Sequence, residues 1–213
     1  MVKWMPVSPE DPMAEPPIDP HHHRPDARDW DRRYQARQAP GEPARVLSLH
    51  RHLLPRAGLA LDLACGLGAN ALLLAAAGLT TLAWDYAPLA IQQLEALARE
   101  RQLDIRAEVR DVVAEPPEPG RFAVITVSRF LERSLAPALM AALAPGGLLF
   151  YETFVRDRVA AMGPDNPDFL LRENELLQLF GDLRLRVYRE EGSVGDVSRG
   201  IRNVAMLVAQ RGE

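Results

Sequence analysis

The sequence has only one cysteine, Cys65, in 213 residues. A single cysteine cannot form a disulfide within the chain, and the histidines do not combine with it in the spacing of a zinc site. We therefore expect no structural disulfide, no metal centre and a reducing compartment, the cytoplasm. A covalent role for Cys65 would need a basic partner, which the sequence does not offer, so its side chain is expected to pack.

Long apolar runs and clustered basic charge are missing as well. No run approaches the ~20 residues that a membrane-spanning helix needs, and the first residues lack the basic and then apolar layout of a signal peptide. The net charge is -4, with 25 basic residues scattered among 29 acidic ones, whereas nucleic-acid binding normally needs a clustered basic excess. The sequence thus argues against membrane insertion, secretion and nucleic-acid partners.

Proline divides the chain into two parts. Residues 1–25 are interrupted by proline so often that neither a helix nor a central strand can persist, which predicts a flexible arm. Three adjacent histidines in this arm, His21, His22 and His23, make a poor preorganised metal site. The composition is 47% hydrophobic and 25% charged, which is ordinary for a globular protein. Residues 26–213 are therefore predicted to form one domain with its own core.

Segments of strand length alternate with segments of helix length along most of this domain. The expected strands are 59–64, 79–85, 105–111, 122–128 and 148–154, and the helices between them are 69–78, 88–102 and 134–147. Further helices are expected at 26–35, 43–58 and 173–180. Helical crossovers of this kind join parallel strands.

The end of the chain breaks this alternation. Strands expected at 183–190 and 203–210 are joined by a loop too short for a crossover, so they must form an antiparallel pair. The predicted fold class is therefore α/β, a doubly wound seven-stranded sheet that is mostly parallel, with an antiparallel last strand and helices on both faces.

A glycine-containing turn follows the first expected strand, in "LDLACGLGAN" at residues 61–70. Gly66 and Gly68 allow a tight turn and close approach of a ligand to the backbone, and the first helical N–H groups offer an anion site. The pattern also satisfies the dinucleotide-type G-x-G-x-x-A motif. Asp62, however, places a negative charge beside the turn. That charge disfavours a diphosphate and suits a cationic ligand that carries an ammonium and a sulfonium group.

Two more acids fall at the ends of neighbouring strands. Asp85 ends the second strand, roughly 20 residues after the glycines, where a carboxylate can accept both ribose hydroxyls. Asp111 ends the third strand and is placed to accept from an adenine amino group. Because ligands of open parallel sheets bind beyond the carboxyl ends of the strands, all three acids are expected at one site.

Four segments carry a family resemblance over residues 59–154: "LDLACGLGAN", "WDYAPLAI", "RDVVAEP" and "LAPGGLLFYETF". Together they resemble the class I S-adenosylmethionine-dependent methyltransferases, with Ala64 where that family usually has a first glycine. More narrowly, "DWDRRY" and "GPDNPDFLLRENELLQLF" are similar to small bacterial methyltransferases associated with tellurite resistance. The resemblance implies a Rossmann-like fold, S-adenosylmethionine as cofactor and methyl transfer to a small molecule that it does not identify.

The resemblance also implies a set of cofactor-binding residues along the matched segments. They are Asp62, Ala64, Cys65, Gly66, Gly68, Asn70, Asp85, Tyr86, Asp111, Val112 and Ser128. Ser128 closes the fourth expected strand and begins the loop that is expected to form one wall of the acceptor pocket.

Candidates on the acceptor side are Arg129, Tyr34 and Glu152. Arg129 can steer an anionic acceptor or form an ion pair with a nearby carboxylate. Tyr34, with Trp30 on the same face of its helix, can close the cofactor pocket or serve as a core aromatic residue. The segment 161–172 has the character of a lid or of an ordinary surface connection, and its Arg172 is a second possible anion ligand. No histidine falls near this pocket, so an obvious general base is missing.

Two other functions remain open at the level of sequence. The G-x-G-x-x-A match is compatible with an NAD(P)-dependent oxidoreductase. The missing general base and the proline-rich arm are compatible with a non-catalytic protein that binds the cofactor.

Overall fold

The computed structural model describes residues 26–213 with the exception of Gln38. The predicted arm at residues 1–25, with its three histidines, lies outside the described residues, so its division from the domain stays a prediction. None of the helices in the described ranges is long and apolar enough to cross a membrane.

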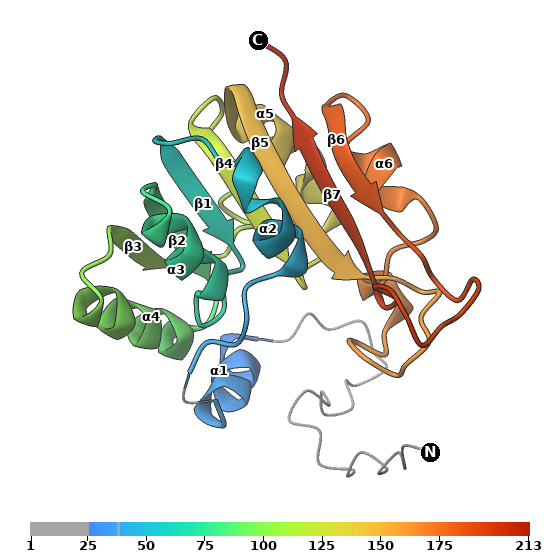
Figure 1. The fold of residues 1–213 in the computed structure, drawn as a ribbon. Coiled ribbons are helices and arrows are strands. Elements are labelled where there is room, and N and C mark those ends of the chain that lie inside the picture. Colours follow the sequence, from blue (N-terminus) through green and yellow to red (C-terminus); the bar gives the residue numbers. More distant parts are fainter. Residues whose placement is uncertain (1–25, 38) are drawn as a thin grey trace, which may run out of the picture.

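One seven-stranded sheet forms the centre of the protein, in the order β3-β2-β1-β4-β5-β7-β6 (Figure 1). Its strands are β1 Leu59–Leu63, β2 Thr80–Asp85, β3 Ile105–Val109, β4 Phe122–Ser128, β5 Leu143–Phe154, β6 Arg184–Arg189 and β7 Val204–Gln210. The strands β1 to β5 pair in parallel, whereas β7 pairs antiparallel to both β5 and β6. The predicted mixed sheet is therefore confirmed.

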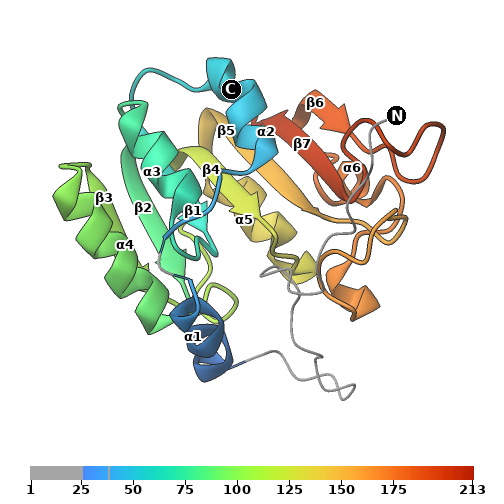
Figure 2. The ribbon, with the colours of Figure 1, turned by 60° about the horizontal axis from the view of Figure 1, so that its bottom comes forward.

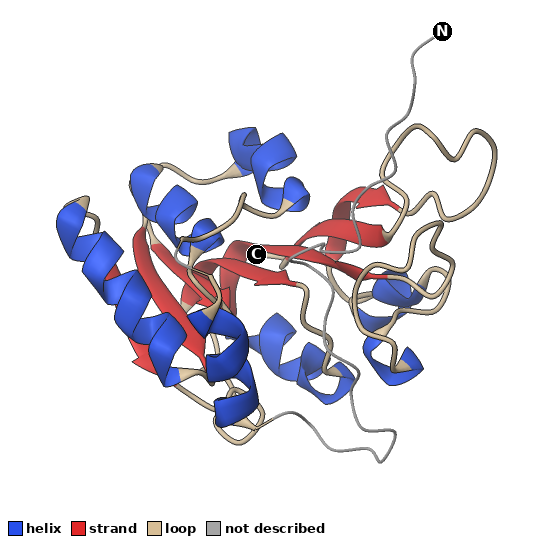
Figure 3. Ribbon diagram, turned by 90° about the horizontal axis from the view of Figure 1, so that it is seen from below, coloured by secondary structure: helices blue, strands red, loops and turns tan. Residues whose placement is uncertain are grey.

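Six α-helices accompany the sheet in the described part of the chain. They are α1 Ala27–Gln35, α2 Arg45–His50, α3 Ala69–Ala76, α4 Pro88–Glu100, α5 Ala136–Ala142 and α6 Glu175–Leu179. Short 3-10 turns lie at Arg51–Leu53, Arg133–Leu135 and Pro167–Phe169. Seen along the sheet, the helices cover both of its faces (Figure 3).

Two sequence-based boundaries were wrong. The helix expected over 43–58 ends at His50 and continues only as a 3-10 turn to Leu53, because Pro55 and Gly58 cannot continue it. The strand expected over 148–154 begins earlier, at Leu143, because the proline-glycine turn that was expected to close the preceding helix belongs to the irregular start of β5.

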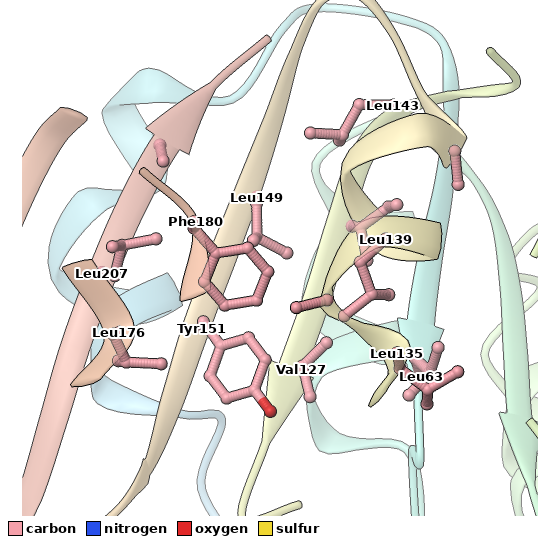
Figure 4. Close-up of a cluster of buried hydrophobic side chains, with 14 of the residues drawn as sticks. Leu63, Val127, Leu135, Leu139, Leu143, Leu149, Tyr151, Leu176, Phe180 and Leu207 are labelled. Carbon is pink, nitrogen blue, oxygen red and sulfur yellow. The ribbon is translucent and has the colours of Figure 1, made fainter. Parts of the chain in front are cut away.

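Each face of the sheet has its own apolar cluster, as the two-residue period of strands requires. Alternate residues such as Leu63, Val127 and Tyr151 face α5 and α6 (Figure 4). Their neighbours Val124 and Phe150 face α2 and α3. The central position of β4, expected from its almost wholly apolar sequence, follows from burial on both faces. The carboxyl ends of β1, β2 and β4 therefore meet at one edge, and this edge carries the candidate site.

Candidate functional site

The turn after β1 has the left-handed backbone that its glycines suggest. Gly66 and Gly68 have φ values of 52° and 81°. A Cβ atom on Gly66 would lie 2.9 Å from the Tyr34 hydroxyl, and one on Gly68 would collide with Leu94. Ala64 also has a positive φ, 55°, so the alanine that replaces the family's usual glycine holds a strained conformation.

Asp62 is fully buried in β1. Its Oδ2 accepts a hydrogen bond from the Ala71 N–H at 3.0 Å, and its Oδ1 accepts from Asn70 Nδ2 at 3.4 Å. Burial raises the pKa of this carboxyl to about 7, against the opposing effect of both hydrogen bonds. The carboxylate therefore caps α3 from the neighbouring strand, which the sequence did not indicate, and its expected interaction with a cationic ligand stays a prediction.

Asp85 joins the two loops at this edge of the sheet. Its Oδ2 accepts from the Gly66 N–H at 2.7 Å, and its Oδ1 accepts from the Ala87 N–H at 2.9 Å. Burial raises the pKa of the carboxyl, while these backbone donors lower it. The expected neighbourhood of Asp85 and the glycine turn is thus present in the structure.

Asn70 connects three elements through its buried amide. Its Oδ1 accepts from the Ala44 N–H, just before α2, at 2.8 Å. Its Nδ2 donates to Ser128 Oγ, at the end of β4, at 2.9 Å. Asn70 and Ser128, both predicted at the site, are therefore in contact, but sequence reasoning missed the attachment of α2. The Ala44 contact joins residues 26 apart and has no local sequence signal.

Helix α1 lies over this edge and brings two aromatic residues to the site (Figure 2). The rings of Trp30 and Tyr34 stack with their centroids 6.1 Å apart, as their spacing of four residues predicts. Both pack against Leu67, Ala87 and Ala90. Burial, and secondly the charge of Asp85, raise the pKa of the Tyr34 phenol. Tyr34 is therefore placed against the glycine turn.

The acceptor candidates Arg129 and Glu152 lie on adjacent strand ends. Arg129 is exposed, has a φ of 54°, and its N–H donates to the Glu152 carbonyl oxygen at 2.9 Å. The Glu152 side chain is buried, and its Oε2 accepts from the Val46 N–H of α2 at 2.7 Å. Burial raises the pKa of Glu152, whereas that hydrogen bond and the Arg129 charge lower it. Glu152 therefore binds α2 through its side chain and Arg129 through its backbone.

The remaining predicted residues have simpler surroundings. Asp111 Oδ1 accepts from the Val113 N–H at 3.0 Å and shapes the turn after β3. Val112 is buried, and Tyr86 is partly buried beside Asp85. Cys65 is buried, which raises the pKa of its thiol well above the usual value and supports a packing role. No group of three potential metal ligands occurs in the ranges that the structure describes.

The segment proposed as a lid leaves β5 and returns to it. Leu171 pairs in parallel with Val155, and the exposed Arg172 follows the return. The Arg133 side chain donates to the carbonyl oxygens of Asp168 and Leu170 in this segment, at 2.5 and 3.1 Å. It also forms a bidentate ion pair with Glu175 of α6, at 2.8 and 3.0 Å. Sequence reasoning missed this ion pair, because 42 residues separate its partners.

Comparison with known proteins shows which family these loops resemble. Residues 60–147 match the model of a methyltransferase domain. Over these residues the chain is similar to the methyltransferase family. The ubiquinone biosynthesis O-methyltransferase of Azotobacter vinelandii is 30% identical over 136 residues, which are 60% of this chain and 58% of that protein. Hemagglutinin 1 of Eikenella corrodens is 34% identical over 138 residues, 61% of this chain and 45% of that protein.

The chain thus spans about half the length of the curated relatives that it matches. Among solved structures, TehB from Haemophilus influenzae is similar in fold, with a TM-score of 0.66 and 19% identity over 85% of this chain and 67% of that one. The segment matched to the methyltransferase domain contains the glycine turn, Asp85 and Arg129, but neither α1 nor Glu152.

Proposed function

We propose that this chain transfers a methyl group from S-adenosylmethionine to a small-molecule acceptor. The observation that carries the proposal is the connection of the glycine turn to Asp85, inside the segment that matches the methyltransferase domain. The charge of the site supports it, because buried carboxylates beside the glycine turn suit a ligand with an ammonium and a sulfonium group.

The proposed cofactor contacts are those of the sequence prediction. The turn from Ala64 to Gly68 would take the amino-acid end of the cofactor, with Asp62 and Asn70 behind it. Asp85 and Tyr86 would face the ribose, Asp111 and Val112 the adenine, and Ser128 the end of the pocket nearest the acceptor. A nicotinamide dinucleotide fits less well, because Asp62 would place a carboxylate near its diphosphate.

When bound, S-adenosylmethionine supplies an activated methyl group, and the displacement at that carbon is in line. The protein's contribution is therefore alignment and the exclusion of water. Tyr34 covers the turn. Arg129 is proposed to attract an anionic acceptor, with Glu152 holding the backbone of Arg129 in position. Such an acceptor needs no proton removed, which agrees with the placement of His50 and His52 around the end of α2 rather than in this site.

We also assign the protein to the cytoplasm and expect no nucleic-acid partner, on the strength of its single cysteine and its scattered basic charge. A non-catalytic role as a cofactor-binding protein is the second possibility, and the experiment below distinguishes it.

Isothermal titration of the full chain with S-adenosylmethionine, S-adenosylhomocysteine and NADH tests the cofactor. We expect binding of both sulfur compounds and none of NADH; the reverse result would overturn the proposal. Methyl transfer is then measured on a panel of thiols, phenols, selenite and tellurite, with each anionic acceptor matched to a neutral analogue. Tight cofactor binding without transfer to any member would support the non-catalytic role instead.

A further inference from the structure

Helix α1 is held differently from the other helices. None of its residues is fully buried, and its aromatic residues Trp30 and Tyr34 rest on Leu67, Ala87 and Ala90. Those three residues belong to the glycine turn and to the start of α4, so α1 packs on the two loops that form the candidate site. Figures 1 and 2 both show α1 beside the start of α4.

Helix α2, by contrast, is attached to the centre of the protein. The N–H groups of Ala44 and Val46 donate to the buried side chains of Asn70 and Glu152. Elements with few buried contacts open at a lower free-energy cost than elements of the core. We therefore expect α1 to detach while α2 and the sheet remain in place.

A hydrogen bond connects α1 to the start of α4. Asp31 Oδ1 accepts a hydrogen bond from the Leu89 N–H at 3.0 Å. The preceding helical residue, Pro88, has no N–H, and the N-cap residue Ala87 provides no side-chain acceptor. Leu89 therefore carries the first available donor of α4, and a carboxylate from another helix takes the place of a local cap.

This contact lies within residues 85–89, which begin with the proposed cofactor residues Asp85 and Tyr86. The Ala87 N–H donates to Asp85 Oδ1, so Asp85 holds the loop on the side of the glycine turn while Asp31 holds it from α1. The charge of Asp31 also acts on Asp85, whose pKa is raised first by burial and further by Asp31. A conformational change in residues 85–89 must consequently alter the surface on which α1 packs.

We propose that Asp31 is a positioning residue that latches α1 onto the 85–89 loop, so that α1 closes over bound cofactor and slows its release. The inference rests on the proposed function. Binding that requires the latched state becomes weaker by the factor by which latching is lost. Methyl transfer from the fully occupied enzyme needs no contact from Asp31, so its rate is expected to stay close to that of the unmodified protein.

The test compares three variants of the full chain. Asp31→Ala removes the acceptor, and Asp31→Asn keeps an oxygen that can accept from Leu89. Asp29→Ala is the matched control, since Asp29 lies on the same helix and takes part in its capping box with Asp26, without contacting α4. Hydrogen exchange of the amides of α1 and Leu89 is followed with and without S-adenosylhomocysteine, together with the affinity for that ligand and its dissociation rate.

For Asp31→Ala we expect an S-adenosylhomocysteine Kd about five- to tenfold higher, arising mainly from faster dissociation, as the loss of one capping bond implies. The KM for S-adenosylmethionine should rise by a similar factor with little change in kcat. Asp31→Asn should restore most of the affinity, and Asp29→Ala should stay within about twofold of the unmodified protein, because its effect is local fraying.

Equal losses in Asp29→Ala and Asp31→Ala would overturn the latch, because general unfolding of α1 would then explain both. The exchange measurement without ligand tests the latch separately from the proposed function. If the chain bound no S-adenosylhomocysteine, the proposed function would fail, yet Asp31→Ala should still speed exchange at Leu89 and in α1. Unchanged exchange there in the absence of ligand rules the latch out.

Discussion

The carboxylate of Asp85 accepts a hydrogen bond from the backbone of Gly66 at 2.7 Å, so the end of β2 is fastened directly to the turn that follows β1. The two residues come from neighbouring parallel strands, whose carboxyl ends meet at one edge of the sheet. One acid thereby sets the distance between the two loops proposed to hold opposite ends of the cofactor.

Replacing this acid should affect both folding and binding. Asp85→Asn retains one acceptor oxygen where two backbone donors are now satisfied, and a buried donor left unpaired costs about 1–3 kcal/mol. We expect urea denaturation to show a loss of that size, and calorimetry to show at least a tenfold loss of S-adenosylmethionine affinity. Asp104→Asn, an exposed acid at the start of β3 that bonds to Thr80, should leave the affinity unchanged.

The strain at Ala64 predicts a stabilising substitution. A left-handed conformation costs a residue with a Cβ atom about 1–2 kcal/mol, part of which glycine loses again through its greater freedom in the unfolded chain. Ala64→Gly should therefore raise the free energy of unfolding by about 0.5–1 kcal/mol. Ala75→Gly, inside α3, should lower it by about 1 kcal/mol. A loss of stability in Ala64→Gly would contradict the strained turn.

Substitutions at Arg129 should change stability and activity by separate mechanisms. Its φ of 54° is matched by Gln102, also at 54°, in the turn after α4 and away from the site. Glycine at either position should stabilise the fold by about 0.5–1 kcal/mol in urea denaturation. Only Arg129→Gly should also reduce methyl transfer to an anionic acceptor, by raising its KM about tenfold. If Gln102→Gly lowered the activity equally, the proposed role of Arg129 in acceptor binding would be wrong.

The buried Asp62 predicts a pH dependence of stability. Its pKa is about 7 in the folded protein and about 3.9 in an unfolded chain. Between these values the folded state binds more protons, so stability contributed by this group is present at low pH and is lost as the pH rises toward 7. The slope is at most about 1.4 kcal/mol per pH unit for one proton.

Urea denaturation of the unmodified protein and Asp62→Asn at pH 5, 6, 7 and 8 isolates this effect. Asparagine cannot ionise, so the variant should gain stability relative to the unmodified protein between pH 5 and 7 and remain level above that range. Shifted groups that do not interact with Asp62, such as Glu175, are present in both proteins and cancel in the difference. A constant difference across this pH series would show that Asp62 does not titrate there.

Local patterns were sufficient to predict most of the fold. The alternation of apolar strands and amphipathic helices specified the parallel crossovers, and the short loop before β7 specified the antiparallel pair. The glycine turn and the end of β2 were predicted together because strand ends share an edge. The residues proposed to contact the cofactor are thus close in space, although their contacts with it remain predictions.

The attachments between distant segments were not predictable from the sequence. The contacts from Asn70 to Ala44 and from Glu152 to Val46 join a side chain to a backbone N–H, which every residue except proline carries. For the same reason the hydrogen bond from the Ala71 N–H of α3 to Asp62 could not be predicted from the motif. The helix predicted over 43–58 was too long because its apolar residues continue to Leu54. Backbone constraints at Pro55 and Gly58 end the regular structure earlier.

The pairing of Val155 with Leu171 has an evolutionary consequence. Because this contact closes the base of the excursion after β5, the residues between its ends can be exchanged for a peptide of different length without shifting the strands. Insertions and deletions can therefore accumulate in this excursion while the register of the sheet is inherited unchanged.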